Sequence, residues 1–212
     1  MKILISCILF FSLVISYANA DSVKSATRRY PKSKSGIIKY NISGTITGTE
    51  VVYYEDWGRR EAIYTRTTMN LRGVTVDRNT LTLLEDNGRW INNIDLNART
   101  GLRMKNPQYK EYVGKSRVEL ENTKRKSLKD AGARRAEIER VAGKPCIVWA
   151  EQYTGNETYT WNGIILKKVT GSGFYKRTTV ATEITESVNI PEEKFTIPPD
   201  IQMKTLDMSV FH

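Results

Sequence analysis

Histidine and cysteine are scarce in this chain, and their scarcity argues against several kinds of active site. The 212 residues contain one histidine, His212, and two cysteines, Cys7 and Cys146. Because His212 is the last residue of the sequence, its ring would be poorly fixed for catalysis. We therefore expect no Ser-His-Asp or Cys-His system and no histidine-rich zinc site. The expectation is no catalytic residue, no metal site and no cofactor.

The sequence also contains no carboxylate pair that is spaced for catalysis and no phosphate-binding glycine motif. Glu55-Asp56, Glu85-Asp86 and Glu192-Glu193 are adjacent pairs, and neighbouring strand residues face opposite sides of a sheet. They are typical of turn and surface acids rather than of a glycosidase pair. The glycines form neither a P-loop nor a dinucleotide fingerprint. An enzyme would have to use isolated carboxylates, tyrosine, lysine or Cys146, so we interpret the chain as non-catalytic.

Long apolar runs are absent except at the start of the sequence. Lys2 precedes an apolar stretch from Ile3 to Ile15, and Ala18-Asn19-Ala20 offers small residues where a signal peptidase cuts. This pattern predicts a cleavable export signal over residues 1–20, with cleavage after Ala20. A membrane anchor is the weaker alternative, because a bilayer span needs about 20 apolar residues. We expect a periplasmic protein with no transmembrane segment in the mature chain.

The mature chain has the length of one domain and carries a single thiol. With Cys7 removed, no intrachain disulfide can form, and we expect Cys146 to be a small buried strand residue. Residues 21–35 are polar and basic, which predicts a flexible lead-in. The domain itself is expected over residues 36–212, a length that can bury a sizeable core.

Basic residues outnumber acidic ones, 33 against 23, for a formal net charge of +10. They cluster at Arg28-Arg29-Lys32-Lys34, at Lys124-Arg125-Lys126-Lys129 and at Arg134-Arg135. In an exported protein this balance favours lipid headgroups, anionic glycans or acidic proteins as partners, and not nucleic acid. For each cluster taken alone, solvated surface charge is the alternative.

What the sequence contains in abundance is short β-forming segments separated by turn residues. Ile38 to Ile46 alternates apolar and polar residues with period two, which predicts a half-buried strand. Asp86-Asn87-Gly88 predicts a hairpin turn, because these residues tolerate positive φ. We expect an extended tail around Phe195 and Ile197 to pack against the core. The same reasoning predicts about eleven strands: Ile38–Ile46, Thr49–Asp56, Arg59–Met69, Thr75–Leu84, Arg89–Asp95, Leu102–Met104, Glu137–Val141, Cys146–Tyr153, Thr158–Trp161, Ile164–Val169 and Tyr175–Val188.

One segment, Pro107 to Gly132, has helical spacing instead. Its apolar stripe is thin and contains Lys124, which is typical of a helix that rests on a surface. A single sheet leaves an apolar face uncovered, so we predict a strongly curved sheet with this helix as its lid. We expect the lid to be the most mobile ordered part of the domain. Its apolar contacts would come from Tyr109, Val113, Leu120 and Leu128, and its contacts to an anionic surface from Lys124, Arg125, Lys126 and Lys129.

Large aromatic residues on the predicted strands are the remaining candidates for a site. They could form a packed sheet core, or they could line a concave sheet that holds a lipid-like ligand. For the second case, the candidate cavity residues are Tyr40, Tyr54, Tyr64, Trp90, Trp149 and Trp161.

Several short segments resemble the periplasmic outer-membrane lipoprotein-carrier superfamily, LolA/LolB-like, over roughly Ser35 to Ile201. The chain looks like a branch of small exported proteins within that superfamily. The resemblance implies a half-barrel of eleven antiparallel strands over a hydrophobic cavity, with helices as a lid. The matching segments are Gly36–Tyr40 (GIIKY), Val52–Ala62 (VYYEDWGRREA), Asp86–Leu96 (DNGRWINNIDL), Val141–Trp149 (VAGKPCIVW), Trp161–Leu166 (WNGIIL) and Phe195–Pro198 (FTIP).

The resemblance also implies binding of acyl chains or lipidated proteins without catalysis. The sequence departs from the carriers at Ser22–Ser35, which lacks the apolar stripe of their first helix, and no functional residue can be carried over. We expect a periplasmic, monomeric binding protein that holds a lipid, acyl chain or lipidated protein, with an anionic membrane surface as a further partner. The alternative is a structural or interaction protein of the bacterial envelope, with a filled core and a basic docking face.

Overall fold

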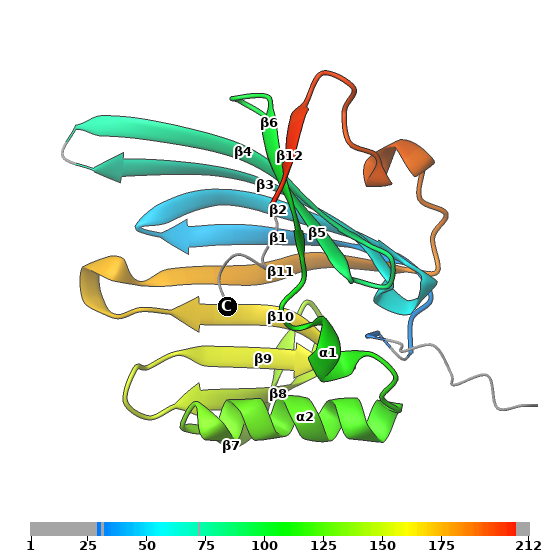
Figure 1. The fold of residues 1–212 in the computed structure, drawn as a ribbon. Helices are drawn as coiled ribbons and strands as arrows, with labels where there is room; N and C mark the ends of the chain where they lie inside the picture. The colour runs from blue at the N-terminus through cyan, green and yellow to red at the C-terminus, as the bar shows by residue number, and fades with distance from the viewer. Residues whose placement is uncertain (1–28, 31, 72, 207–212) are drawn as a thin grey trace, which may run out of the picture.

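The computed structural model describes residues 29–30, 32–71 and 73–206, and these form one twelve-stranded sheet with two helices (Figure 1). The predicted export signal lies outside the described residues. The helices are α1 (Tyr109–Tyr112) and α2 (Arg117–Asp130). The strands are β1 (Gly36–Gly44), β2 (Ile46–Glu55), β3 (Arg60–Leu71), β4 (Val74–Glu85), β5 (Trp90–Asp95), β6 (Thr100–Lys105), β7 (Ala133–Val141), β8 (Lys144–Glu151), β9 (Glu157–Trp161), β10 (Ile164–Thr170), β11 (Arg177–Glu186) and β12 (Gln202–Thr205).

The strand order is β12-β6-β5-β4-β3-β2-β1-β11-β10-β9-β8-β7, so the sheet is open, with β12 and β7 at its ends. Two meanders, β1 to β6 and β7 to β11, meet where β1 pairs with β11. The prediction of a mainly β domain with one sheet and a helical insertion is confirmed. The sheet has twelve strands where about eleven were predicted, and the predicted antiparallel pairing has one exception, because β12 adds to β6 in parallel. Four residues are too few for a readable alternation pattern.

Tight turns lie where the sequence predicted them. Asp86, Asn87 and Gly88 all have positive φ, as the predicted hairpin requires. Trp57 also has positive φ, in the turn between β2 and β3. Its amide donates to Lys34 O over 2.9 Å, and its carbonyl accepts from the Tyr30 amide over 3.0 Å. These two bonds attach the described start of the chain to the end of the sheet.

One face of β1–β5 is covered by the C-terminal segment, and we call it the tail face. Its buried residues on the strands are Ala62, Leu81, Leu83 and Ile94, packed under Ile190 and Phe195. Phe195 is 4% exposed, which confirms that the predicted tail packs on the core. Removing this apolar area from water stabilises the fold by about 25 cal/mol per Å².

The opposite face, which we call the helix face, carries the second core cluster. Strand residues alternate between faces, so Val52 and Ile63 lie on the helix face while their neighbours Tyr53 and Tyr64 lie on the tail face. Cys146 belongs to the helix-face cluster and is fully buried, which confirms its predicted place in a strand.

The predicted lid is two helices rather than one, and it covers less of the sheet than expected. Figure 1 shows α2 along the end of the sheet formed by β7 and β8, and α2 packs against β7. Ser116 begins α2 with a capping box that it shares with Glu119. Leu120 is buried, whereas Val113 and Val118 are exposed, so the thin apolar stripe binds only one end of the sheet. Within the described part of the chain, no helix is long and apolar enough to cross a membrane.

Candidate functional site

A cavity of about 660 Å³ lies on the helix face, between the sheet and the two helices. Aliphatic side chains from β2 to β5 and from β10 line part of it. These are Val52, Ile63, Leu84, Ile91, Ile164 and Ile165. Charged side chains line a further part. These are Arg29, Glu50, Glu61, Lys124, Lys167, Lys168 and Arg177.

Strand register explains the aliphatic part of the cavity. Val52 is the cross-strand partner of Ile63, and Leu84 is the partner of Ile91. Directly opposed residues of an antiparallel pair point to the same face, with side chains in contact distance. The two pairs are diagonal neighbours across β3 and β4, because the direct partner of Leu84 is Glu61, which lies two residues before Ile63 on the same face of β3. Together they form an apolar strip across four strands.

Glu61 is a buried carboxylate on β3, between the two pairs of this strip, with 5% of its surface exposed. Its Oε2 accepts from the Tyr30 hydroxyl over 2.6 Å and pairs with the Arg29 guanidinium over 2.6 Å. Arg29 also donates to the carbonyl of Gly58. Burial, and then the charge of Glu61, raise the pKa of Tyr30 well above its ordinary value, so the phenol stays protonated. The carboxylate is therefore neutralised by groups that precede β1.

These contacts also change the interpretation of the predicted flexible lead-in, residues 21–35. Its residues 21–28 lie outside the described part of the chain. Arg29 and Tyr30 are held by Glu61, and Ser33 is buried where it accepts a 2.7 Å hydrogen bond from Tyr54. The described part of the lead-in is thus packed on the domain. The basic cluster gave no sign of this, because its partner carboxylate lies 32 residues away.

Two further charged groups are partly withdrawn from water in the cavity. Glu50 accepts a 3.0 Å hydrogen bond from Thr65, and burial raises the pKa of Glu50. Lys124 is exposed along much of its length, but its ammonium donates to Gly163 O over 3.1 Å. Burial of that ammonium lowers the pKa of Lys124. In all, five basic and two acidic side chains line the cavity, so its charge is net positive.

Chemically, this arrangement can hold a molecule that has an apolar body and an anionic group. The one thiol of the described chain, Cys146, is fully buried, and burial raises its pKa, which disfavours the reactive thiolate. Among the residues that the structure describes, no three His, Cys, Asp or Glu side chains are grouped to hold a metal ion.

Of the six predicted aromatic cavity residues, only Tyr40 lines this cavity. Tyr54 is 0% exposed in the core beneath it. Tyr64 points to the tail face, where its hydroxyl donates to Lys194 O over 3.0 Å. Trp90 lies under the Arg103 guanidinium, 4.8 Å from its ring centre.

The other two tryptophans are also elsewhere. Trp161 packs against the helix-face core with the Lys144 ammonium 4.4 Å from its ring centre, and Trp149 lines a separate groove. Ring size was the wrong criterion, because these rings pack in the core, on the tail face or against charged side chains. The aliphatic strip was missed, although its alternation with tail-face residues such as Tyr53 and Tyr64 was readable in the sequence.

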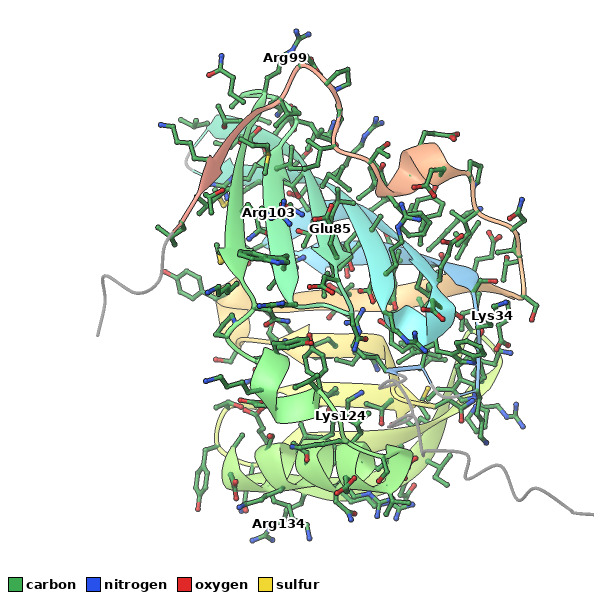
Figure 2. All side chains as sticks on the ribbon, turned by 45° about the vertical axis from the view of Figure 1, so that its right-hand side comes forward. Lys34, Glu85, Arg99, Arg103, Lys124 and Arg134 are labelled. Carbon is green, nitrogen blue, oxygen red and sulfur yellow. The ribbon has the colours of Figure 1, made fainter. Side chains whose placement is uncertain are left out.

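The predicted lid and basic residues are divided between different surroundings. Tyr109, Val113, Leu120 and Leu128 do not line the cavity, and the neighbouring Tyr112 does. Of the predicted anionic-surface contacts, Lys124 lines the cavity, Arg125 and Lys129 line a groove on the other side of α2, and Lys126 lines neither. Figure 2 shows Lys124 and Arg134, which also lines that groove, at opposite sides of α2.

No family model and no curated protein matches this chain. Among solved structures, it is similar to an uncharacterized conserved protein from Thermus thermophilus, with a TM-score of 0.52 and 11% identity. That match covers 84% of this chain and 95% of the other, and it shows a shared fold.

MucB is a further match, at a TM-score of 0.44 and 14% identity, covering 82% of this chain and 61% of MucB. The complex of Pseudomonas aeruginosa MucA and MucB gives a TM-score of 0.43, 15% identity, and coverage of 81% and 58%. This chain thus spans about three fifths of the length of MucB. At these TM-scores the likeness carries no argument about function.

Proposed function

We propose that this protein is a non-catalytic binding protein of the periplasm that holds an amphiphile, an acyl chain with an anionic group, in the helix-face cavity. A free lipid or the acyl chain of a lipidated protein would both meet this description. The apolar strip of Val52, Ile63, Leu84 and Ile91 beside an excess of basic side chains is the observation that carries the proposal. The resemblance of its short motifs to the lipoprotein carriers points to the same ligand class.

The size and chemistry of the cavity support this ligand. Its volume of about 660 Å³ lies within the range of small-molecule sites, roughly 300–1,000 Å³. Each methylene buried against the strip would contribute about 0.8 kcal/mol. Lys167, Lys168 and Arg177 lie on β10 and β11, across the sheet from the strip, where they would attract the anionic group.

Uptake of a fluorescent fatty acid tests the proposal with two matched substitutions. Ile165 lines the cavity at 45% exposure, and Ile138 lies on β7 outside the cavity at 63% exposure. Both are exposed enough to accept a charge without loss of the fold. Ile165→Glu should weaken binding about tenfold or more, because it desolvates a carboxylate beside the acyl chain. Ile138→Glu should bind like the wild type. No uptake by the wild type, or equal affinities for all three proteins, would refute the proposal.

The absence of catalysis is a separate part of the proposal. Lipid that copurifies with the protein from periplasm should have the same mass before and after incubation with it. Conversion of that lipid to products would identify an enzyme instead. Export is tested by sequencing the mature N-terminus, which should begin at Asp21 in the periplasmic fraction.

A structural or interaction protein of the envelope is the second candidate. The observation in its favour is that Tyr54, Trp149 and Trp161 are buried or packed against the core instead of lining the cavity. A hydrophobic dye such as ANS separates the two candidates. The folded protein should enhance dye fluorescence if the cavity accepts apolar ligands, and a fatty acid should displace the dye. A filled core would bind no dye.

A further inference from the structure

A second hollow, of about 610 Å³, lies where the C-terminal end of α2 meets β7 and β8. Arg125 and Lys129 of α2 form one wall, and Arg134 and Arg135 of β7 form another. Ile147 and Trp149 of β8 also line it. We call this hollow the basic groove. It is separate from the helix-face cavity, with which it shares no lining residue.

The charges of the basic groove are not balanced by the protein. No acidic side chain lines it, and Lys129, Arg134 and Arg135 form no ion pair with any residue that the structure describes. Arg125 has only an exposed contact of 4.0 Å to Glu121. In the helix-face cavity, by contrast, Glu61 neutralises Arg29. Four basic residues line this one concave surface, where they concentrate positive potential and attract an anionic partner.

The depth of the basic groove favours an extended polypeptide as its partner over the flat surface of a membrane. Trp149 is 6% exposed, so its ring is recessed, and Arg135 is its direct cross-strand partner at the wall. A bilayer surface would touch the basic side chains without reaching this ring. A peptide could place carboxylates on the walls and one apolar side chain toward Ile147 and Trp149. Tryptophan and arginine are among the residue types enriched at the energetically dominant positions of protein interfaces.

We propose that the basic groove binds an acidic, extended segment of another protein. The carboxylates of the segment would pair with Arg125, Lys129, Arg134 and Arg135, and an apolar side chain would contact Ile147 and Trp149. This binding does not depend on the proposed amphiphile site, because the two surfaces lie on different sides of α2.

The test uses the full-length mature protein and a fluorescein-labelled peptide of sequence Glu-Glu-Leu-Glu-Glu-Leu, followed by fluorescence anisotropy. The wild type should bind this peptide, and binding should weaken as ionic strength rises. The double variant Arg134→Gln/Arg135→Gln should raise the Kd about tenfold or more, which corresponds to about 1.4 kcal/mol. The control Lys110→Gln/Lys126→Gln removes the same charge from exposed positions outside the groove, and it should change the Kd less than about twofold.

Three outcomes would overturn the proposal. The first is absence of binding by the wild type. The second is an equal loss in both double variants, which would indicate non-specific attraction to the net charge. The third is binding to phosphatidylglycerol vesicles that depends on Arg134 and Arg135 while peptide binding does not, which would assign the groove to a membrane. The pair Arg125→Gln/Lys129→Gln, on α2, repeats the test if the β7 variant fails to fold.

Discussion

The two faces of strands β2–β5 receive alternate residues of the same four segments, yet they are completed in different ways. On the tail face, Leu81, Leu83 and Ile94 are almost fully buried under Ile190 and Phe195. On the helix face, Val52 and Ile63 lie beside a cavity. The strands supply apolar residues to both faces. What distinguishes them is the covering segment, since the C-terminal tail seals one face and the helices cover only the end of the other.

The placement of charge follows the same division. Glu50 and Glu61 both lie on the helix face, and basic side chains from three different parts of the chain surround them. Glu61 is the one charged residue that is buried among those the structure describes, whereas Arg60 and Lys194 stay partly exposed beside the tail-face rings of Phe195 and Tyr53. Since charges are costly to bury in a purely structural core, the buried Glu61 supports the proposal that the helix face is the functional one.

The largest effect on stability should come from removing a buried ring from the tail face. Phe195→Ala should lower the free energy of unfolding by about 3–5 kcal/mol, because it removes a buried ring from a sealed core. Urea unfolding measures the change. Fatty-acid binding by the folded variant should be unchanged, because the cavity lies on the other face. Loss of binding in a folded Phe195→Ala protein would show that the two faces are not independent.

A gain in stability should come from replacing Asn92, a buried polar residue among the apolar residues of the tail face. It is 0% exposed, and neither amide atom has a hydrogen-bond partner among the described residues. Asn92→Leu keeps the branching and the number of side-chain heavy atoms and removes two unsatisfied groups, so it should raise the free energy of unfolding by about 1–3 kcal/mol. A midpoint of urea unfolding equal to or below that of the wild type would contradict this. The exposed neighbour Asn93, changed to Leu, is the control.

The helices should open more readily than the strand beneath them. We expect amides of residues 112–128 to exchange about tenfold or more faster than those of residues 146–153, a difference of about 1.4 kcal/mol, because α2 buries little apolar surface. Hydrogen exchange followed by mass spectrometry measures both segments. Addition of a fatty acid should slow exchange in the first segment. Equal protection without ligand would make α2 part of the core.

A substitution at the start of α2 sharpens the same comparison. Ser116→Ala removes the capping hydrogen bond to the Glu119 amide and should destabilise α2 by about 1 kcal/mol. Exchange should accelerate in α2 and not in β8. Ser172→Ala is the matched control, because Ser172 also precedes a short helix but its side chain makes no capping bond. An unchanged exchange rate in α2 would mean that the cap contributes nothing to its stability.

The smallest effect concerns Glu50 and depends on pH. Burial raises the pKa of Glu50 above the ordinary 4.5, so the folded state binds this proton more tightly than the unfolded state does. The resulting stability is present below the unfolded pKa and is lost as pH rises through the folded pKa. The Glu50→Gln side chain is neutral at every pH. The variant should therefore be more stable than the wild type at pH values above the folded pKa of Glu50, and equally stable at pH values below its unfolded pKa. Thermal unfolding from pH 3 to pH 7 measures this, with the exposed Glu183→Gln as the control.

Much of the fold could be predicted from the sequence, because local patterns determine it. Period-two alternation located β1, the Asp86-Asn87-Gly88 signal located a hairpin, and the apolar Phe195 located the packed tail. The parallel pairing of β12 could not be predicted, since it depends on where the chain returns after the tail. The break between α1 and α2 was missed because a thin stripe looks the same with or without an interruption.

The residues of the candidate site could be predicted much less well from the sequence than the strands could. Alternation shows that Tyr40 and Tyr64 each point to one face of the sheet. It does not show which of the two faces another segment of the chain covers. Tyr64 is outside the site because it points to the face that the tail covers, and Tyr54 is outside it because its ring is packed deep in the core. The pairing of Arg29 with Glu61 is a contact between distant parts of the chain, which a single sequence does not reveal.

Photo-crosslinking tests the central claim, that the helix face binds an acyl chain and the tail face does not, most directly. A fatty acid with a diazirine near the end of its chain would be bound to the wild-type protein, irradiated, and its attachment sites found by peptide mass spectrometry. The account predicts attachment in the peptides that contain Val52, Ile63, Leu84 and Ile91, with an excess of unlabelled fatty acid abolishing it. Attachment in residues 188–203 instead, or none that unlabelled fatty acid can compete for, would contradict it.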